Sequence, residues 1–122
     1  MQNQFQFDEQ EGVIYIIFQG DQTYATVQEL RAPLEEAANK LREQGRPVLV
    51  LGDTTEMKHQ DSGSRKAGVD MMTAVNFLKY ALVITSPYLR LISQFIVKAK
   101  GFGNKVGHFS NAEDALTWLK SS

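Results

Sequence analysis

The sequence has 122 residues, of which 43% are hydrophobic and 22% are charged, and its formal net charge is -1. This length is close to the commonest size of a single domain, so we expect one domain over residues 1–122. The near-zero charge argues against a nucleic-acid-binding domain, because such domains draw affinity from a basic excess. The sequence contains no cysteine, which excludes a disulfide framework, a thiolate metal site and a cysteine nucleophile.

Neither a signal peptide nor a membrane-spanning segment is evident in the sequence. Residues 1–5 lack the basic and apolar regions of a signal peptide. Apolar runs such as residues 13–18 are far shorter than the ~20 residues that span a bilayer. We therefore expect a cytoplasmic protein that is not transmembrane.

Two strands and a helix are predicted in the first third of the chain. Residues 4–8 alternate between apolar and polar, which is typical of a half-buried strand, and residues 13–18 are continuously apolar, which is typical of a buried one. Thr26 and Glu29 have the spacing of a capping box that begins a helix ending at Gly45. The apolar stripe of this helix consists of Val27, Leu30, Leu34, Ala37, Ala38 and Leu41.

Pro33 lies too deep in this helix to be a first-turn proline. Proline removes one backbone donor and clashes with the preceding turn. The sequence therefore predicts either a kink at this point or a short first segment followed by a new helix start.

The rest of the chain alternates between strands and helices. The predicted elements are a strand over 48–51, a polar loop over 52–64, a helix over 65–78, a strand over 81–84, a helix from Pro87 to Gly101 capped by Ser86, a strand over 105–109 and a helix over 112–120 with a capping box of Ser110 and Glu113. The order β-β-α-β-α-β-α-β-α predicts an α/β fold. Its sheet is expected to be mixed and mostly parallel, with about four helices.

Two stretches of sequence resemble the STAS domain and the related SpoIIAA-like proteins. The strand over 48–51 leads to Asp53, and Asp61-Ser62-Gly63-Ser64 follows, similar to the strand, Asp or Asn, and Asp-Ser-Ser-Gly motif of STAS anti-sigma-factor antagonists. The strand over 79–84, the helix after it, and a closing pattern from Phe109 to Leu119 also resemble SpoIIAA-like, STAS/CRAL-TRIO-related proteins. The resemblance runs from about Gly12 to Leu119 and implies a SpoIIAA-like fold.

The resemblance places a candidate phosphoacceptor at Ser62. A phosphate at a helix N-terminus would be favoured by the helix dipole, with Arg65 and Lys66 one turn on. In the alternative interpretation, Asp61, Ser62 or Ser64 simply caps the helix. Gly63 and Ser64 stand in reversed order relative to the motif of the antagonists.

The polar loop and the helix start form a candidate surface for a protein partner. The residues of this predicted surface are Asp53, Lys58, His59, Asp61, Arg65 and Lys66. Their spacing matches no metal-ligand motif, and a Ser62–His59 pair would need an orienting group and an oxyanion hole that no pattern supplies. Gly101-Phe102-Gly103 follows a helix, so it is a helix stop rather than a dinucleotide motif. We predict no enzyme activity, no metal and no cofactor.

The helix after Pro87 is apolar around more than half of its circumference. Leu91, Phe95 and Val97 are therefore a candidate dimer face or ligand face, or they are buried by a neighbouring helix. Met57, Met71 and Met72 would offer an adaptable lining for a cavity.

Three functions follow from these observations. The leading hypothesis is a regulatory or protein-interaction module that forms a homodimer. The second is a carrier or sensor of a small apolar or lipid-like ligand, for which the resemblance to CRAL-TRIO proteins also argues. The third is an anti-sigma-factor antagonist switched by phosphorylation at Ser62.

Overall fold

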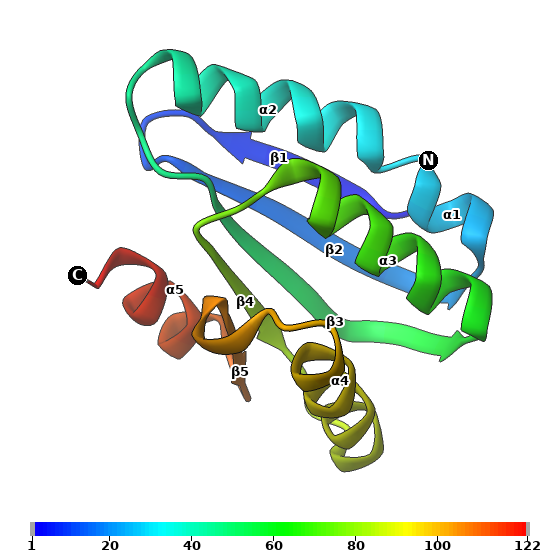
Figure 1. Ribbon diagram of the computed structural model, residues 1–122. Coiled ribbons are helices and arrows are strands. Elements are labelled where there is room, and N and C mark those ends of the chain that lie inside the picture. Colours follow the sequence, from blue (N-terminus) through cyan, green and yellow to red (C-terminus); the bar gives the residue numbers. More distant parts are fainter. Residues whose placement is uncertain (1, 122) are drawn as a thin grey trace.

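One five-stranded sheet organises the computed structural model, which describes residues 2–121 (Figure 1). The strands are β1 (Gln4–Asp8), β2 (Val13–Gln22), β3 (Leu49–Gln60), β4 (Lys79–Val83) and β5 (Val106–Phe109). The helices are α1 (Tyr24–Gln28), α2 (Arg31–Glu43), α3 (Ser62–Val75), α4 (Pro87–Ala99) and α5 (Ala112–Lys120), with a 3-10 turn η1 (Gly103–Lys105) before β5.

The strands stand in the sheet in the order in which they occur in the chain, β1-β2-β3-β4-β5. β1 pairs antiparallel with β2, with Phe5 opposite Ile16, and the other three pairings are parallel. The prediction of a mixed, mostly parallel sheet is confirmed.

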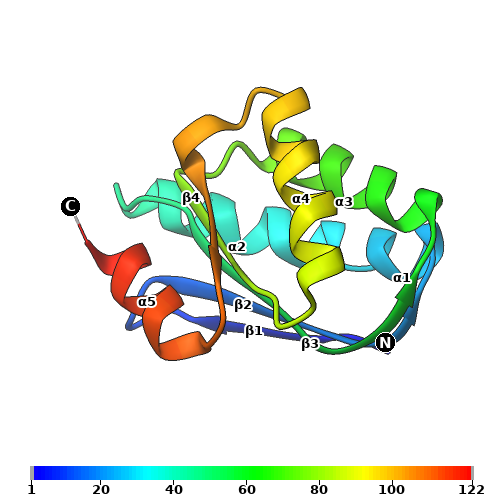
Figure 2. The same ribbon diagram turned by 90° about the horizontal axis from the view of Figure 1, so that it is seen from below.

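Helices cover the two faces of the sheet unequally. Figure 2 shows α1 to α4 on one face and α5 on the other. The larger core cluster joins the sheet to α1, α2 and α3, and includes Ile14, Val50 and Met71. The smaller cluster packs α5 on the opposite face, where Ala115 and Leu119 contact Leu51 and Val83. These two cores explain why β2, β3 and β4 are apolar on both faces.

The first predicted helix is divided into α1 and α2, which confirms the expectation of a short segment followed by a new start. Pro33 is the third residue of α2, where its missing N–H is not needed for an intrahelical hydrogen bond. The predicted capping box was wrong by three residues. Thr23 is extended and its side chain accepts a hydrogen bond from the N–H of Thr26 at 3.3 Å, and the Thr26 hydroxyl accepts from the N–H of Thr23 at 3.0 Å.

The predicted polar loop over 52–64 was wrong, because β3 continues to Gln60. The cause is β2, which is long enough to pair in parallel with β3 up to Gln22 opposite Gln60. β4 is shorter and its pairing with β3 ends at Val83 opposite Asp53. Residues 54–60 are therefore a strand with a partner on one side only, which is why they read as polar and loop-like in the sequence.

The ends of the C-terminal helices mostly agree with the predictions. Ser86 caps α4 by accepting a hydrogen bond from the N–H of Leu89 at 3.3 Å. Gly101 has a φ of +72°, which confirms the left-handed helix stop, and Phe102 packs back on Phe77 with ring centroids 5.8 Å apart. The cap of α5 is Asn111, whose side chain accepts from the N–H of Asp114 at 2.8 Å, rather than Ser110 as predicted.

Candidate functional site

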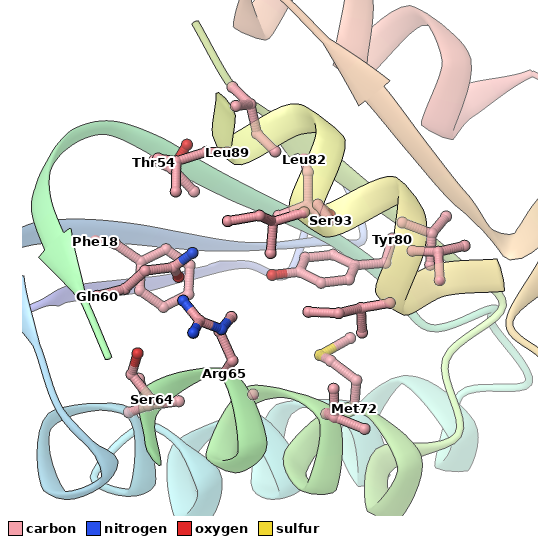
Figure 3. A pocket seen from close by; sticks show the side chains of 18 of the residues that line it. Phe18, Thr54, Gln60, Ser64, Arg65, Met72, Tyr80, Leu82, Leu89 and Ser93 are labelled. Atoms are coloured by element: carbon pink, nitrogen blue, oxygen red, sulfur yellow. The ribbon is translucent and has the colours of Figure 1, made fainter. Parts of the chain in front are cut away.

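A pocket of about 150 Å³ lies between the sheet, α3 and α4 (Figure 3). We call it the α3–α4 pocket. Its walls are mostly apolar, with Leu82 on the sheet, Met71 and Met72 on α3, and Ile92 and Ile96 on α4. A pocket therefore lies between α4 and the sheet, where one of the alternatives for α4 places a ligand cavity, and its use as a ligand site stays a prediction.

Tyr80 brings a polar atom into this apolar pocket from β4. The residue is only 8% exposed, and Figure 3 shows its hydroxyl pointing into the pocket. The hydroxyl makes no hydrogen bond with the described residues 2–121. Every fully enclosed side-chain N or O atom of these residues has a partner, so the Tyr80 oxygen is not fully enclosed. It therefore faces the pocket's open space. Burial raises the pKa of Tyr80, so the hydroxyl stays protonated and can donate.

Gly52 on β3 makes room for the Tyr80 ring. An ideal Cβ at position 52 would stand 2.6 Å from the Tyr80 oxygen and 2.9 Å from its Cε1 atom. Any side chain at this position would displace the ring. Gly52 was predicted at the start of the polar loop after the strand over 48–51, although a glycine within a strand signals a close approach by another group.

Arg65 and Gln60 line the same pocket from the start of α3 and the end of β3. In Figure 3 the Arg65 side chain extends from α3 on the side toward which the Tyr80 hydroxyl points. The guanidinium of Arg65 has neither an ion pair nor a hydrogen bond within residues 2–121. Arg65 was predicted as part of a partner surface, and the structure places its side chain at the pocket.

The α4 helix closes the pocket without being buried itself. None of its residues is buried, and Ser93 Oγ lies 2.8 Å from Nε2 of His108 on β5. Burial lowers the pKa of His108, and the charge of Arg90 lowers it further. The neutral imidazole is therefore favoured at this contact between α4 and the sheet.

The predicted face of α4 divides into two sides. Val97 lines the α3–α4 pocket, whereas Leu91 and Phe95 are 67% and 74% exposed on the outer side. Tyr88, which is 71% exposed, stands one turn before Leu91. These exposures contradict the alternative in which a neighbouring helix buries Leu91 and Phe95, and the dimer face stays a prediction.

The other predicted surface residues lie on and beside residues 54–60 of β3, which pair only with β2, and at the start of α3. Asp53 accepts a hydrogen bond from the N–H of Thr55 at 2.8 Å, and Nδ1 of His59 lies 3.0 Å from a carboxylate oxygen of Asp21. Lys58 is exposed on the strand.

At the start of α3, the capping interpretation holds for Asp61, whose side chain accepts from the N–H of Ser64 at 2.8 Å. Ser64 is buried, and its hydroxyl donates to the backbone oxygen of Asp61 at 2.8 Å. Ser62 is exposed at the first position of the helix, and Lys66 forms an ion pair with Asp70 at 3.1 Å. The helix N-terminus therefore presents Ser62 to solvent while Asp61 and Ser64 hold the turn.

Residues 2–121 bring together no three His, Cys, Asp or Glu side chains that could hold a metal ion. Over the same residues, every helix is too short or too polar to cross a membrane.

Comparison with known proteins gives a family without an assigned activity. Residues 7–122 match the model of a family described as a domain of unknown function (DUF7793). No curated protein sequence matches this chain.

Two solved structures are similar over nearly the whole chain. One is the anti-sigma factor antagonist SpoIIAA in its unphosphorylated form, with 15% identity, a TM-score of 0.68 and coverage of 98% of this chain and 99% of that one. The other is an uncharacterised protein of the DUF3478 family from Shewanella loihica PV-4, described as having a SpoIIAA-like fold. It has 14% identity, a TM-score of 0.65 and coverage of 96% of this chain and 91% of that one. The SpoIIAA-like fold predicted from the sequence is confirmed.

Proposed function

The chain belongs to the DUF7793 family, and we propose that it is a non-enzymatic regulatory module of STAS type that binds a protein partner. The observation that carries this proposal is the strand edge left by β3, which continues past the end of β4 over residues 54–60. An unpaired edge offers backbone donors and acceptors to an extended segment of another protein. The similarity of the fold to SpoIIAA, an anti-sigma factor antagonist, also supports a regulatory role.

The partner surface in this proposal consists of the β3 edge and the start of α3. Lys58, His59 and Asp61 are exposed there, with Ser62 at the first position of α3 and Lys66 one turn later. Charged side chains at an edge discourage indiscriminate strand pairing, so they favour a partner of complementary charge.

Site-specific photo-crosslinking tests this surface. A photo-reactive residue at Lys58 is expected to capture the partner in cells of the source organism, whereas the same residue at Glu36, exposed on α2, should not. With the purified partner, Lys58→Glu should weaken binding about tenfold or more, as expected for reversal of an interfacial charge, and Glu36→Lys should not. Equal capture at the two positions, or equal affinities of the two variants, would contradict the proposal.

Ser62 gives this surface a means of control. A phosphate there would add nearly two negative charges at the N-terminus of α3, beside the β3 edge. If Ser62 is the switch, Ser62→Asp should change the affinity of the crosslinked partner and Ser62→Ala should not. Intact-mass measurement of the protein from its own cells would show whether a phosphate is present.

We also propose that the chain forms a homodimer through the outer side of α4. Tyr88, Leu91 and Phe95 form an exposed apolar stripe, which a second copy of the same helix would cover in a two-fold arrangement. Sedimentation of the native chain is expected to give a dimer, and Phe95→Glu a monomer. A monomeric native chain at micromolar concentration would rule out this pairing.

A second candidate function is carriage or sensing of a small apolar ligand. The α3–α4 pocket supports it, because apolar walls with a few polar atoms are typical of ligand sites. Native mass spectrometry of the freshly purified chain tests it through any ligand retained during purification.

A further inference from the structure

The α3–α4 pocket has the size and lining of a site for a compact apolar group. A cavity of about 150 Å³ lined by apolar side chains holds a molecule of about the size of benzene, and this pocket has a volume of about 150 Å³. The three methionines that line it, Met57, Met71 and Met72, are flexible and can adapt to an irregular ligand. The volume therefore limits the buried part of a ligand to a single ring or a short chain.

Most polar side chains that line the pocket already have partners in the fold. Thr54 donates to the backbone oxygen of Val83 at 2.8 Å, Ser64 to that of Asp61 at 2.8 Å, and Ser93 lies 2.8 Å from the His108 ring. These groups are committed to holding β3, α3 and α4 in place.

Three polar groups of the lining differ, because their side chains make no hydrogen bond within residues 2–121. They are the Tyr80 hydroxyl, the Arg65 guanidinium and the Gln60 amide. The Tyr80 hydroxyl reaches the open space of the pocket, where water or a ligand can take its hydrogen bond. A ligand with an acceptor atom at this point would replace that water and keep the hydrogen bond.

The charge of the lining selects the kind of acceptor. Arg65 is permanently cationic and only donates hydrogen bonds, and the protonated Tyr80 hydroxyl donates as well. The described lining contains no Asp or Glu that would neutralise Arg65 or attract a cation. The unpaired donors therefore favour an anionic oxygen over a neutral or a cationic group.

We propose that the α3–α4 pocket binds a small amphipathic acid, with its apolar body among the methionines and its carboxylate accepting hydrogen bonds from Tyr80 and Arg65. Gln60 completes the head-group end with an amide. This proposal rests on the second candidate function, ligand carriage or sensing, and specifies the ligand class for the same pocket.

A matched series of three compounds tests the head group. They are 3-phenylpropionate, 3-phenylpropanol and 3-phenylpropylamine, which share one ring and chain but carry an acid, a neutral hydroxyl and a cation. Each is titrated into the full chain and followed by the methyl NMR signals of Met57, Met71 and Met72, which report the pocket itself. The acid is expected to bind about tenfold or more tightly than the alcohol, since hydrogen bonds to charged groups exceed neutral ones, and the amine most weakly.

Two variants connect this preference to named side chains. Tyr80→Phe and Arg65→Gln should each reduce the affinity for the acid toward that for the alcohol, and leave the affinity for the alcohol within about threefold, because a weak neutral hydrogen bond is worth little net free energy. Lys66→Gln is the control, because it removes a neighbouring positive charge that is paired with Asp70 and does not line the pocket. Tyr80→Phe removes a hydroxyl without a protein partner, so urea unfolding should show a stable fold.

The outcomes separate the two levels of the proposal. Equal binding of acid and alcohol, or equal loss of acid binding in Arg65→Gln and Lys66→Gln, would overturn the acid site while leaving ligand carriage in place. Failure of all three compounds to shift the methionine signals would remove carriage of ligands of this size, and the acid site with it.

Discussion

The phenolic oxygen of Tyr80 lies directly against Gly52 of the neighbouring strand, at a point where the β-carbon of any other residue would stand only 2.6 Å away. The ring of Tyr80 thus lies across β3 because position 52 has no side chain. The pairing of β3 and β4 places Gly52 opposite Leu82 in this part of the sheet, so the contact is fixed by register.

Gly52→Ala is expected to lower the free energy of unfolding by about 1–3 kcal/mol, the range for overpacking a core. The added methyl group would force the buried Tyr80 ring to move, and the pocket would change shape with it. Gly68→Ala is the matched control, since no atom lies within 4 Å of its added Cβ and Gly68 is in the middle of α3. That variant should gain about 0.5–1 kcal/mol. Urea unfolding measures both, and changes of the same sign would contradict the packing at Gly52.

The two serines at the start of α3 should respond oppositely to a negative charge. Ser62 is exposed on the first turn, so Ser62→Asp should change the free energy of unfolding by less than about 1 kcal/mol and in the stabilising direction. Ser64 is 4% exposed and donates to Asp61, so Ser64→Asp should cost about 1–3 kcal/mol. Thermal and urea unfolding of the two variants provide the comparison. A stable Ser64→Asp protein would show that this turn is not the buried one described above.

Replacing Phe77 and replacing Phe95 should have very different effects on the free energy of unfolding. Phe95 is 74% exposed on α4, so Phe95→Ala should change the unfolding free energy of the monomer by no more than about 0.5 kcal/mol. Phe77 is 2% exposed and its ring contacts Tyr80 and Phe102, so Phe77→Ala should cost about 3–5 kcal/mol. The unfolding is measured at concentrations where the chain is monomeric. A large loss at Phe95 under those conditions would mean that α4 packs by its outer side.

His108 should make the fold sensitive to mild acid. Its pKa in the folded protein is lowered from an ordinary value of 6.5, first by burial and then by Arg90, so between these two pKa values the unfolded chain binds more protons. The contribution of His108 to the free energy of unfolding is therefore complete above pH 6.5, and it is lost as the pH falls through the lowered pKa. His108→Gln should reduce this decrease, whereas Ser93→Ala should retain it, because burial is the larger cause. Urea unfolding between pH 8 and pH 5 tests the prediction, which fails if His108→Gln and the native chain have the same slope.

Much of the fold could be predicted because its local patterns and its tertiary contacts agree. The continuous apolar run of β2, the restart forced by Pro33 and the stop at Gly101 each have a local cause, and the structure places all three as predicted. The second half of β3 has no such local cause. Residues 54–60 are polar except for Met57, and they form a strand only because β2, far away in the sequence, is long enough to pair with them.

The pocket depends on contacts that no spacing in the sequence reveals. Tyr80 was expected only as part of a strand, and nothing local shows that its hydroxyl would lack a partner. Gly52 could have been noticed as a glycine inside an apolar strand, but the ring that fills its place comes from the next strand. Arg65 could be placed near the start of α3, but the sequence does not show that it lines a pocket together with Gln60 and Tyr80.

The simple strand order has a consequence for how the chain folds. Each strand pairs only with the strands that precede and follow it in the sequence, so each pairing waits only for the next strand to be synthesised. This order keeps each parallel pairing to a single crossover, which lowers its loop-closure cost relative to an order in which strands far apart in the sequence are neighbours. On the ribosome, each new strand would meet an edge that is already formed, growing the sheet from β1 toward β5. The ion pair of Lys120 with Glu11, at 2.5 Å, would then form at the end of folding, when α5 packs against the sheet near the turn between β1 and β2.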